Sequence, residues 1–184
     1  TAVQSQQVFG GHGYIREWGM EQYVRDARIA QIYEGTNGVQ AMDLVGRKLP
    51  MENGDVARGF FALVRDDLST TKGPAELETV KASVIEALAR LEKLTEELLA
   101  KGADPVEAGA SATDYLRFFA LVSFGWLWVR MAEKASADAT TPLKQRKLAL
   151  ARFFAARLLP QTVSLDAAIR AGAADIMALD ADLF

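Results

Sequence analysis

Residues 77–98 read LETVKASVIEALARLEKLTEEL, and this stretch decides the fold of the chain. Its apolar side chains recur at alternating spacings of three and four residues: Leu77, Val80, Val84, Ala87, Leu91, Leu94 and Leu98. Side chains at that spacing share one face of an α-helix, and a long apolar face must be covered by another helix. The stretch therefore predicts a long helix inside a helical bundle.

The rest of the C-terminal part also reads as helices. Residues 55–69 predict a helix with one stripe formed by Phe60, Leu63, Val64 and Leu68. Asp104-Pro105-Val106-Glu107 predicts another helix start, because it offers an acidic N-cap, proline at the first helical position and a capping-box glutamate. That helix would bury Phe118, Phe119, Val122, Trp126 and Val129. Two further helices are expected over residues 142–159 and 164–178.

Glycine is dense in the first 49 residues, at positions 10, 11, 13, 19, 35, 38 and 46. A helix over 1–9 is expected to end at Gly10-Gly11, since glycine adopts the left-handed geometry of a helix terminus. A helix over 20–28 follows, then irregular backbone, then a helix from the N-cap Thr36 to about residue 48. The turn-forming residues 50–54 predict a boundary between a segment 1–49 and a bundle 54–184. Alternating strand patterns are missing, so the expected fold class is all-α.

Composition excludes several classes of protein. Half of the 184 residues are hydrophobic, so the chain can bury a core. With no cysteine and the single histidine His12, it offers no thiolate nucleophile, Cys-ligated metal or multi-histidine metal site. A net charge of −3 disfavours nucleic acid as a partner. Chemistry must then rest on carboxylates, hydroxyls, amides or a bound cofactor.

The sequence predicts no transmembrane segment. Its most apolar stretch, 118–129, has twelve residues without a charge, whereas a helix that spans a bilayer needs about 20. The chain opens Thr1-Ala2-Val3, with neither methionine nor the pattern of a signal peptide. We therefore expect it to be the tail of a longer protein.

Ile32-Tyr33-Glu34-Gly35-Thr36-Asn37-Gly38 is the best candidate for chemistry. A carboxylate between apolar residues and a helix start could line a dry cavity, where desolvation would raise the pKa of Glu34 toward that of a general base. The backbone N–H groups that follow could donate to an oxyanion or a phosphate. Such a site would suit proton abstraction beside a carbonyl. The competing interpretation is an acidic loop residue without a role, and the residues alone favour it.

Other motifs carry less information. Gly10-Gly11-His12-Gly13 lacks the spacing of a phosphate-binding loop, so a helix-ending turn is the better interpretation. Arg25-Asp26 is interpreted as a structural ion pair or a helix-end interaction. Trp126-Leu127-Trp128 favours core packing over a ligand pocket. The apolar stretch 116–129 could instead contact another subunit, which the sequence does not separate from internal burial.

Three linked motifs carry a family resemblance: QVFGGHGY at residues 7–14, RDARI at 25–29 and IYEGTNGVQ at 32–40. Their order and spacing closely resemble the C-terminal signature of the acyl-CoA dehydrogenases over residues 1–49. The later residues resemble, more loosely, the C-terminal extension of longer bacterial members, such as those acting on methylthio-propionyl-CoA type thioesters. The resemblance implies an all-α helical bundle, formed by the end of the family's C-terminal domain plus an extra helical extension.

The resemblance also implies a reaction, the oxidation of an acyl-CoA thioester to the 2-enoyl-CoA. Glu34 matches the base that removes the α-proton, while the β-hydrogen leaves as hydride to FAD. Tyr33 and Gly35 would border the substrate. The FAD of a neighbouring subunit would be contacted by Gln7, Val8, Phe9, Gly10 and Gly11. The pyrophosphate of FAD would lie near Thr36, Asn37 and Gly38. His12 receives no role.

The family further implies electron-transferring flavoprotein as acceptor, a homodimer or homotetramer, and a bacterial cytoplasmic location. Most of the family's flavin and CoA contacts lie in domains that these 184 residues lack. We therefore expect the chain alone to bind no FAD stably and to show no turnover. Two other interpretations stay open: a non-catalytic helical oligomerisation or interaction module, and a related flavin oxidase on the same scaffold.

Overall fold

A computed structural model describes residues 1–102, 104–137 and 142–183. Within these ranges all regular secondary structure is helical, which confirms the all-α prediction. The chain divides into two compact units, Thr1–Gln40 and Ala41–Phe184. No helix of the described ranges is long and apolar enough to cross a membrane.

The division falls earlier than the composition shift at 50–54. Ala41, Val45 and Leu49 are buried in the same core as the later helices, so the segment before Pro50 packs with the bundle. The assignment of 1–49 and 54–184 to separate domains stays a prediction.

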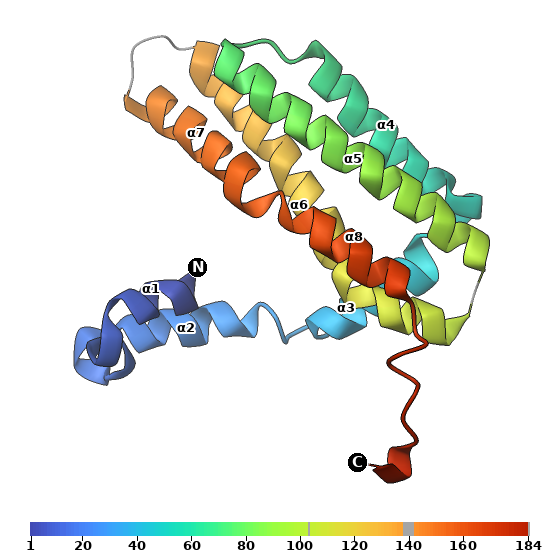
Figure 1. Cartoon of the computed structure of the whole chain (residues 1–184). Helices are drawn as coiled ribbons and strands as arrows, with labels where there is room; N and C mark the ends of the chain where they lie inside the picture. Colours follow the sequence, from blue (N-terminus) through green and yellow to red (C-terminus); the bar gives the residue numbers. More distant parts are fainter. Residues whose placement is uncertain (103, 138–141, 184) are drawn as a thin grey trace. The chain divides into compact units, whose positions relative to one another are not determined.

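The smaller unit is built from two short helices. Its elements are α1 (Ala2–Val8), α2 (Met20–Ile29) and the start of α3 (Asn37–Asp43), with 3₁₀ turns over Gly10–Tyr14 and Arg16–Trp18. α1 and α2 pack side by side (Figure 1). The predicted helices over 1–9 and 20–28 are thus confirmed. The predicted helix over 36–48 is also confirmed, as α3 followed by a π-helical turn, Leu44–Lys48.

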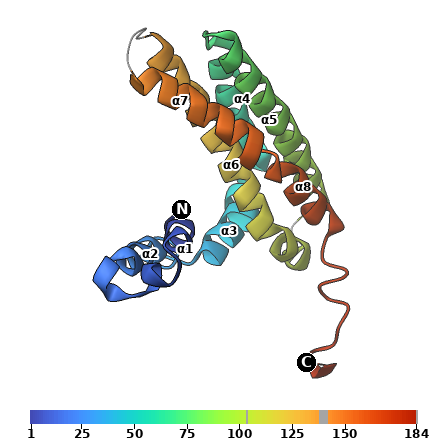
Figure 2. The same ribbon diagram turned by 60° about the vertical axis from the view of Figure 1, so that its left-hand side comes forward.

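The larger unit is a helical bundle. Its helices are α4 (Asp55–Thr70), α5 (Ala75–Lys101), α6 (Pro105–Ala137), α7 (Pro142–Phe153) and α8 (Gln161–Ala171). α6 contacts each of the other four helices. Figure 1 and Figure 2 show α7 and α8 following one another along α6, with α4 and α5 on the other side. Because α4, α5 and α6 are joined by short connections, they run antiparallel to their sequence neighbours.

The apolar stripe of residues 77–98 lies in the bundle core as predicted. Leu77, Val84 and Leu91 have no exposed surface, and only Leu98, at the end of the stripe, is half-buried. From α6, Phe118, Val122 and Val129 are also fully buried. Phe119, Trp126 and Trp128 pack against this core, as the core interpretation of the aromatic run requires.

The stripe predicted for α4 is wrong in part. Leu63 is 54% exposed, and Phe60 is half-buried against Phe119 with ring centroids 5.1 Å apart. The buried residues are instead Ala57, Phe61, Val64 and Leu68. Those four keep the spacing of three and four residues, whereas Leu63 lies about 100° around the helix from Val64.

Of the two contacts predicted at the start of α6, the N-cap is confirmed and the capping box is wrong. Asp104 caps the helix, since its Oδ1 accepts the N–H of Val106 at 2.9 Å. The capping box is wrong, because the Glu107 carboxylate accepts the N–H of Ala173 at 3.1 Å and the Lys101 ammonium at 3.2 Å. The last helix was expected over 164–178 but begins at Gln161 and ends at Ala171, where Gly172 turns the chain with φ +70°.

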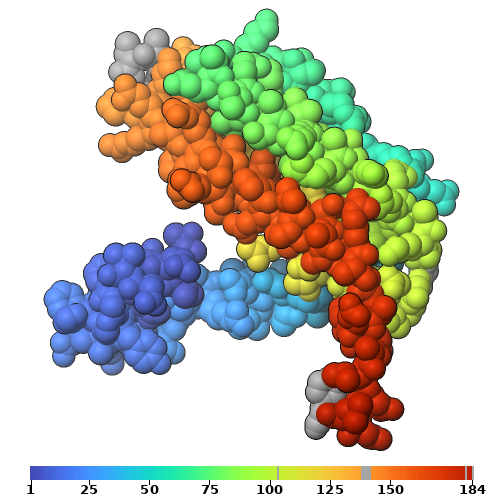
Figure 3. Space-filling view, viewed as in Figure 1, coloured from blue at the N-terminus to red at the C-terminus, as the bar shows by residue number. Residues whose placement is uncertain are grey.

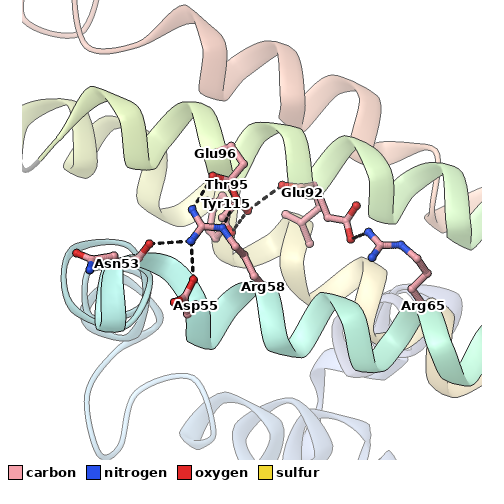
Figure 4. A network of polar contacts seen from close by, with 9 residues as sticks. Asn53, Asp55, Arg58, Arg65, Glu92, Thr95, Glu96 and Tyr115 are labelled. Atoms are coloured by element: carbon pink, nitrogen blue, oxygen red, sulfur yellow. Dashed lines mark hydrogen bonds and ion pairs between the residues drawn. The ribbon is translucent and has the colours of Figure 1, made fainter.

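Charged side chains tie α4 to α5 on the outside of the bundle (Figure 4). The Arg58 guanidinium donates to both oxygens of Glu96 at 2.7 and 2.8 Å, and to Asp55 Oδ1 and the Asn53 carbonyl at 2.8 and 2.9 Å. About two helical turns further along α4, Arg65 pairs with Glu92 of α5. Beneath them, the Tyr115 hydroxyl lies 2.6 Å from Thr95 Oγ1, and burial raises the pKa of Tyr115.

The Arg58 contacts predict a pH-dependent contribution to stability. The Arg58 guanidinium holds the pKa of Glu96 below its usual range, so the folded state keeps this carboxylate ionised at lower pH than the unfolded state does. The stabilisation is complete above the unfolded pKa of a glutamate, about 4.3, and is lost as pH falls through the folded pKa. The difference in urea midpoint between wild type and Arg58→Met should therefore be small, largest at neutral pH, and smaller as pH approaches about 3.

A matched control for this prediction is Arg25→Met. Arg25 pairs with Glu21 within α2 at 2.9 Å and joins no two helices, so its loss should leave the unfolding midpoint of the bundle unchanged. A midpoint difference for Arg58→Met that stays constant across the acid range would contradict the prediction.

Candidate functional site

Glu34 lies in a tight turn between α2 and α3, with an uncommon backbone conformation. Its φ is +56°, in the left-handed region, and Gly35 follows with φ +99°. Side chains other than glycine rarely adopt positive φ, so the surrounding contacts must hold Glu34 in place. A Cβ at Gly35 would lie 3.2 Å from Gln40 Nε2 and 3.2 Å from Val39 Cγ1, which fits the absence of a side chain there.

Three hydrogen bonds fix this turn. Gln40 Nε2 donates to the Glu34 carbonyl at 2.9 Å, and the Asn37 N–H donates to the Gln31 carbonyl at 3.2 Å. Thr36 Oγ1 accepts the Val39 N–H at a long 3.4 Å, so the predicted N-cap is present but weak. The sequence pattern gave no role to Gln40. Its position six residues after Glu34, on the first turn of α3, is the only sequence signal for this contact.

The Glu34 side chain is exposed, and so is that of Tyr33. These residues by themselves therefore do not form the dry cavity that was expected around the carboxylate. Among the described residues, no acceptor takes the N–H of Glu34. The turn thus carries an exposed carboxylate and, in the same residue, a backbone N–H without an acceptor among the described residues.

The other predicted site residues, 7–11, lie at the end of α1. Val8 is 85% exposed and Phe9 is also exposed, while Gly10 turns the chain with φ +57°. The turn is most constrained at Gly13, where a Cβ would lie 2.3 Å from the Gln6 carbonyl oxygen. Gln6 Nε2 closes the turn by donating to the Gly13 carbonyl at 3.1 Å.

The structure does not bring the two predicted stretches together within one chain. Residues 7–11 precede α2, and residues 33–38 follow it, so they lie toward opposite ends of this helix (Figure 1). Ten residues of helix span about 15 Å. No hydrogen bond found in the described ranges joins the two stretches.

The pair Arg25-Asp26 behaves differently from expectation, whereas His12 lies in the turn Gly10–Tyr14 as expected. Arg25 pairs with Glu21 rather than with its neighbour Asp26, which accepts from Gln22 Nε2 at 2.7 Å. Both contacts span four residues, because adjacent residues on a helix point in different directions. His12 packs edge-on against Trp18, with ring centroids 5.1 Å apart.

The smaller unit has almost no core of its own. Gly13 is its only buried residue within 1–40. Large apolar side chains are exposed along it: Val8, Phe9, Tyr14, Ile15, Trp18, Tyr23, Ile29, Ile32 and Tyr33. Apolar surface of this density usually marks an interface or a ligand site. The residues that the structure describes contain no cluster of acidic or histidine side chains that would hold a metal ion.

Comparison with known proteins gives two family matches. Residues 1–49 match the family model described as "Acyl-CoA dehydrogenase, C-terminal domain". Residues 60–180 match the model described as "Acetyl-CoA dehydrogenase C-terminal like".

Curated relatives match over most of the chain. A 3-methylmercaptopropionyl-CoA dehydrogenase from Ruegeria pomeroyi is 35% identical over 83% of this chain and 27% of its own length. A broad-specificity linear acyl-CoA dehydrogenase, FadE5, from Mycobacterium tuberculosis is 31% identical over 99% of this chain and 32% of its own length. A butyryl-CoA dehydrogenase from Syntrophomonas wolfei is 27% identical over 87% of this chain and 28% of its own length. The chain thus spans less than a third of the length of these relatives.

Proposed function

The chain belongs to the acyl-CoA dehydrogenase family, and on that premise we propose that it supplies the active-site turn of an FAD-dependent acyl-CoA dehydrogenase. The observation that carries this proposal is the left-handed backbone of Glu34, held by Gln40. Such a conformation costs about 1–3 kcal/mol, must be held by its surroundings, and is often found at active sites. Glu52 shares the conformation, so the proposal rests on the left-handed backbone of Glu34 together with the family match of the residues around it. The proposed reaction converts an acyl-CoA thioester to the 2-enoyl-CoA.

In this proposal, Glu34 performs two tasks. Its carboxylate takes the proton from the α-carbon of the thioester, so that the electrons of that C–H bond form the new double bond. Its backbone N–H donates to the thioester carbonyl oxygen, where negative charge develops as the proton leaves. Tyr33 and Gly35 flank the carboxylate and would border the acyl chain. Gln40 keeps both groups of Glu34 in position through the Glu34 carbonyl.

The residues present fit one part of an FAD site. FAD, when bound, would accept the β-hydrogen as hydride. Thr36, Asn37 and Gly38 would hold its pyrophosphate, since this stretch combines a hydroxyl with the backbone amides at a helix start. Gln7, Val8, Phe9, Gly10 and Gly11 would contact a second cofactor in a neighbouring subunit, which agrees with their separation from Glu34 along α2.

The isolated 184-residue chain is expected to bind FAD poorly. The two proposed contact stretches are both open to solvent, and in the proposal each would contact a different cofactor. Purified from cells, the chain should therefore lack a stoichiometric visible flavin absorption band. A stoichiometric band in the purified chain would contradict this expectation and show that these residues hold the cofactor by themselves.

The proposed function is tested with the full-length protein that carries this chain. Anaerobic mixing with saturated acyl-CoA thioesters of several chain lengths should bleach its flavin and give a product lighter by two hydrogens. No bleaching with any thioester would favour the alternative, a non-catalytic oligomerisation or interaction module. Rapid oxygen consumption without an added acceptor would identify a flavin oxidase instead of an enzyme that passes electrons to electron-transferring flavoprotein. A homo-oligomeric state and a cytoplasmic location are further proposals drawn from the family.

A further inference from the structure

The outer side of α7 carries an unusual stripe. Leu143, Arg146, Leu150, Phe153 and Arg157 follow one another at spacings of three and four residues, along α7 and into the π-helical turn Phe154–Leu158. All five are exposed, with Leu143 at 58%, Leu150 at 46% and Phe153 at 57%. We call these five residues the α7 stripe. A helix that faced only water would carry polar residues there.

The opposite side of α7 faces the bundle, so the α7 stripe faces away from it. Ala151 and Phe154 are buried, and Phe154 packs against Trp128 with ring centroids 6.5 Å apart. Lys147, at the edge between the two sides, lies over the Trp128 ring at 5.4 Å. Figure 3 shows the α7 surface, in orange, open along one side of the bundle.

The charged residues of the segment 142–165 all have the same sign. Residues 142–165 contain five cations and no acidic residue, although the whole chain has a net charge of −3. The cations are Lys144, Arg146, Lys147, Arg152 and Arg157. The exposed side of α5, by contrast, mixes both signs, as in the pair Arg90–Glu86. Arg152 pairs with Glu76 of α5 at 3.7 Å, whereas in the described ranges no carboxylate pairs with Arg146 or Arg157.

We propose that the α7 stripe docks on the surface of an anionic phospholipid bilayer. Exposed apolar side chains flanked by cations are typical of helices that lie in a membrane interface, with the apolar residues inserted and the cations near lipid phosphates. Charge complementarity selects an anionic surface. The apolar side chains of Leu143, Leu150 and Phe153 favour a surface with an apolar interior into which they can insert. The contact is peripheral and independent of the role proposed for Glu34.

Vesicle co-sedimentation tests this inference on the 184-residue chain and on the full-length protein. Both should bind vesicles rich in phosphatidylglycerol, and neither should bind vesicles of phosphatidylcholine alone. Rising salt should weaken the binding, because it screens the attraction between the cations and the lipid phosphates. The double variant Arg146→Gln with Arg157→Gln should bind at least about tenfold more weakly, as should Phe153→Ser.

Matched controls separate this surface from general charge and apolarity. Leu63→Ser removes an apolar side chain of α4 that is 54% exposed, and Lys93→Gln with Arg16→Gln removes two exposed cations elsewhere. Both controls should bind vesicles as wild type does, with unchanged circular dichroism.

Several results would overturn the proposal. One is equal binding to both kinds of vesicle, and another is an equal loss of vesicle binding in the stripe variants and the control variants. A third is binding by the 184-residue chain but not by the full-length protein, which would mean that other residues cover the α7 stripe. A second copy as the occupant would also overturn it. In that case neither protein binds vesicles, and Phe153→Ser converts an oligomer to a smaller species in light scattering.

Discussion

Replacing Glu34 with glutamine in the full-length protein is expected to slow acyl-CoA dehydrogenation by about 10²- to 10⁴-fold, the usual contribution of a general base. Glutamine has nearly the same size and shape, and its backbone N–H remains, so substrate and FAD should still bind. The loss should therefore appear in the rate of flavin reduction rather than in substrate affinity. Stopped-flow measurement of flavin bleaching, together with a binding titration, separates the two.

The chain offers a matched control in Glu52. It too is an exposed glutamate with left-handed backbone, φ +50°, but it lies in the connection before α4. Glu52→Gln makes the same chemical change in the same backbone conformation, and it should leave the rate of flavin reduction unchanged. If Glu34→Gln reduces flavin as fast as wild type, Glu34 is not the base.

The helices were predictable where the sequence repeats a spacing over several turns. Seven apolar positions from Leu77 to Leu98 define the buried face, so one ambiguous position does not change which face is predicted. In α4 the stripe is shorter, and both Phe60 and Phe61 fit a plausible face. Which of them is buried depends on how Phe119 packs against the helix, and that is a tertiary contact.

Capping and ion pairing were less predictable than helix position. The sequence around Glu107 satisfies the capping-box pattern, yet its carboxylate bonds to Ala173, 66 residues later. A local pattern therefore states what a side chain can reach, while the fold decides which partner it takes. Asp26 bonds to Gln22 and not to Arg25 for a local reason, because residues four apart share a face of a helix and adjacent residues do not.

The candidate site was predictable to the extent that it is local. Residues 33–38 form one turn whose geometry arises from neighbouring residues, and the glycine at position 35 signals it. The left-handed conformation of Glu34 was not predictable, because it depends on the Gln40 side chain across the turn. The Glu34 carboxylate is exposed in this turn, so no pattern within the turn could define the cavity that was expected around it.

Phe118→Ala is expected to lower the free energy of unfolding of the bundle by about 3–5 kcal/mol, the largest stability effect that we predict. Phe118 lies on α6, the helix that contacts every other helix of the bundle, and it has no exposed surface. Its truncation leaves a cavity in the core that the surrounding residues cannot close without losing contacts elsewhere. Because domains of this size are stable by only about 5–15 kcal/mol, the variant should unfold at much lower urea.

Phe124→Ala is the matched control, since Phe124 lies on the same helix but is 53% exposed. It removes the same side-chain atoms and changes the helix propensity by the same amount. The difference in the free energy of unfolding between the two variants therefore measures the effect of the cavity. Phe118→Leu keeps a measurable transition if the alanine variant does not fold, and it should lie between wild type and Phe118→Ala. Equal urea midpoints for Phe118→Ala and Phe124→Ala, followed by circular dichroism, would mean that the α6 core can collapse around the lost ring.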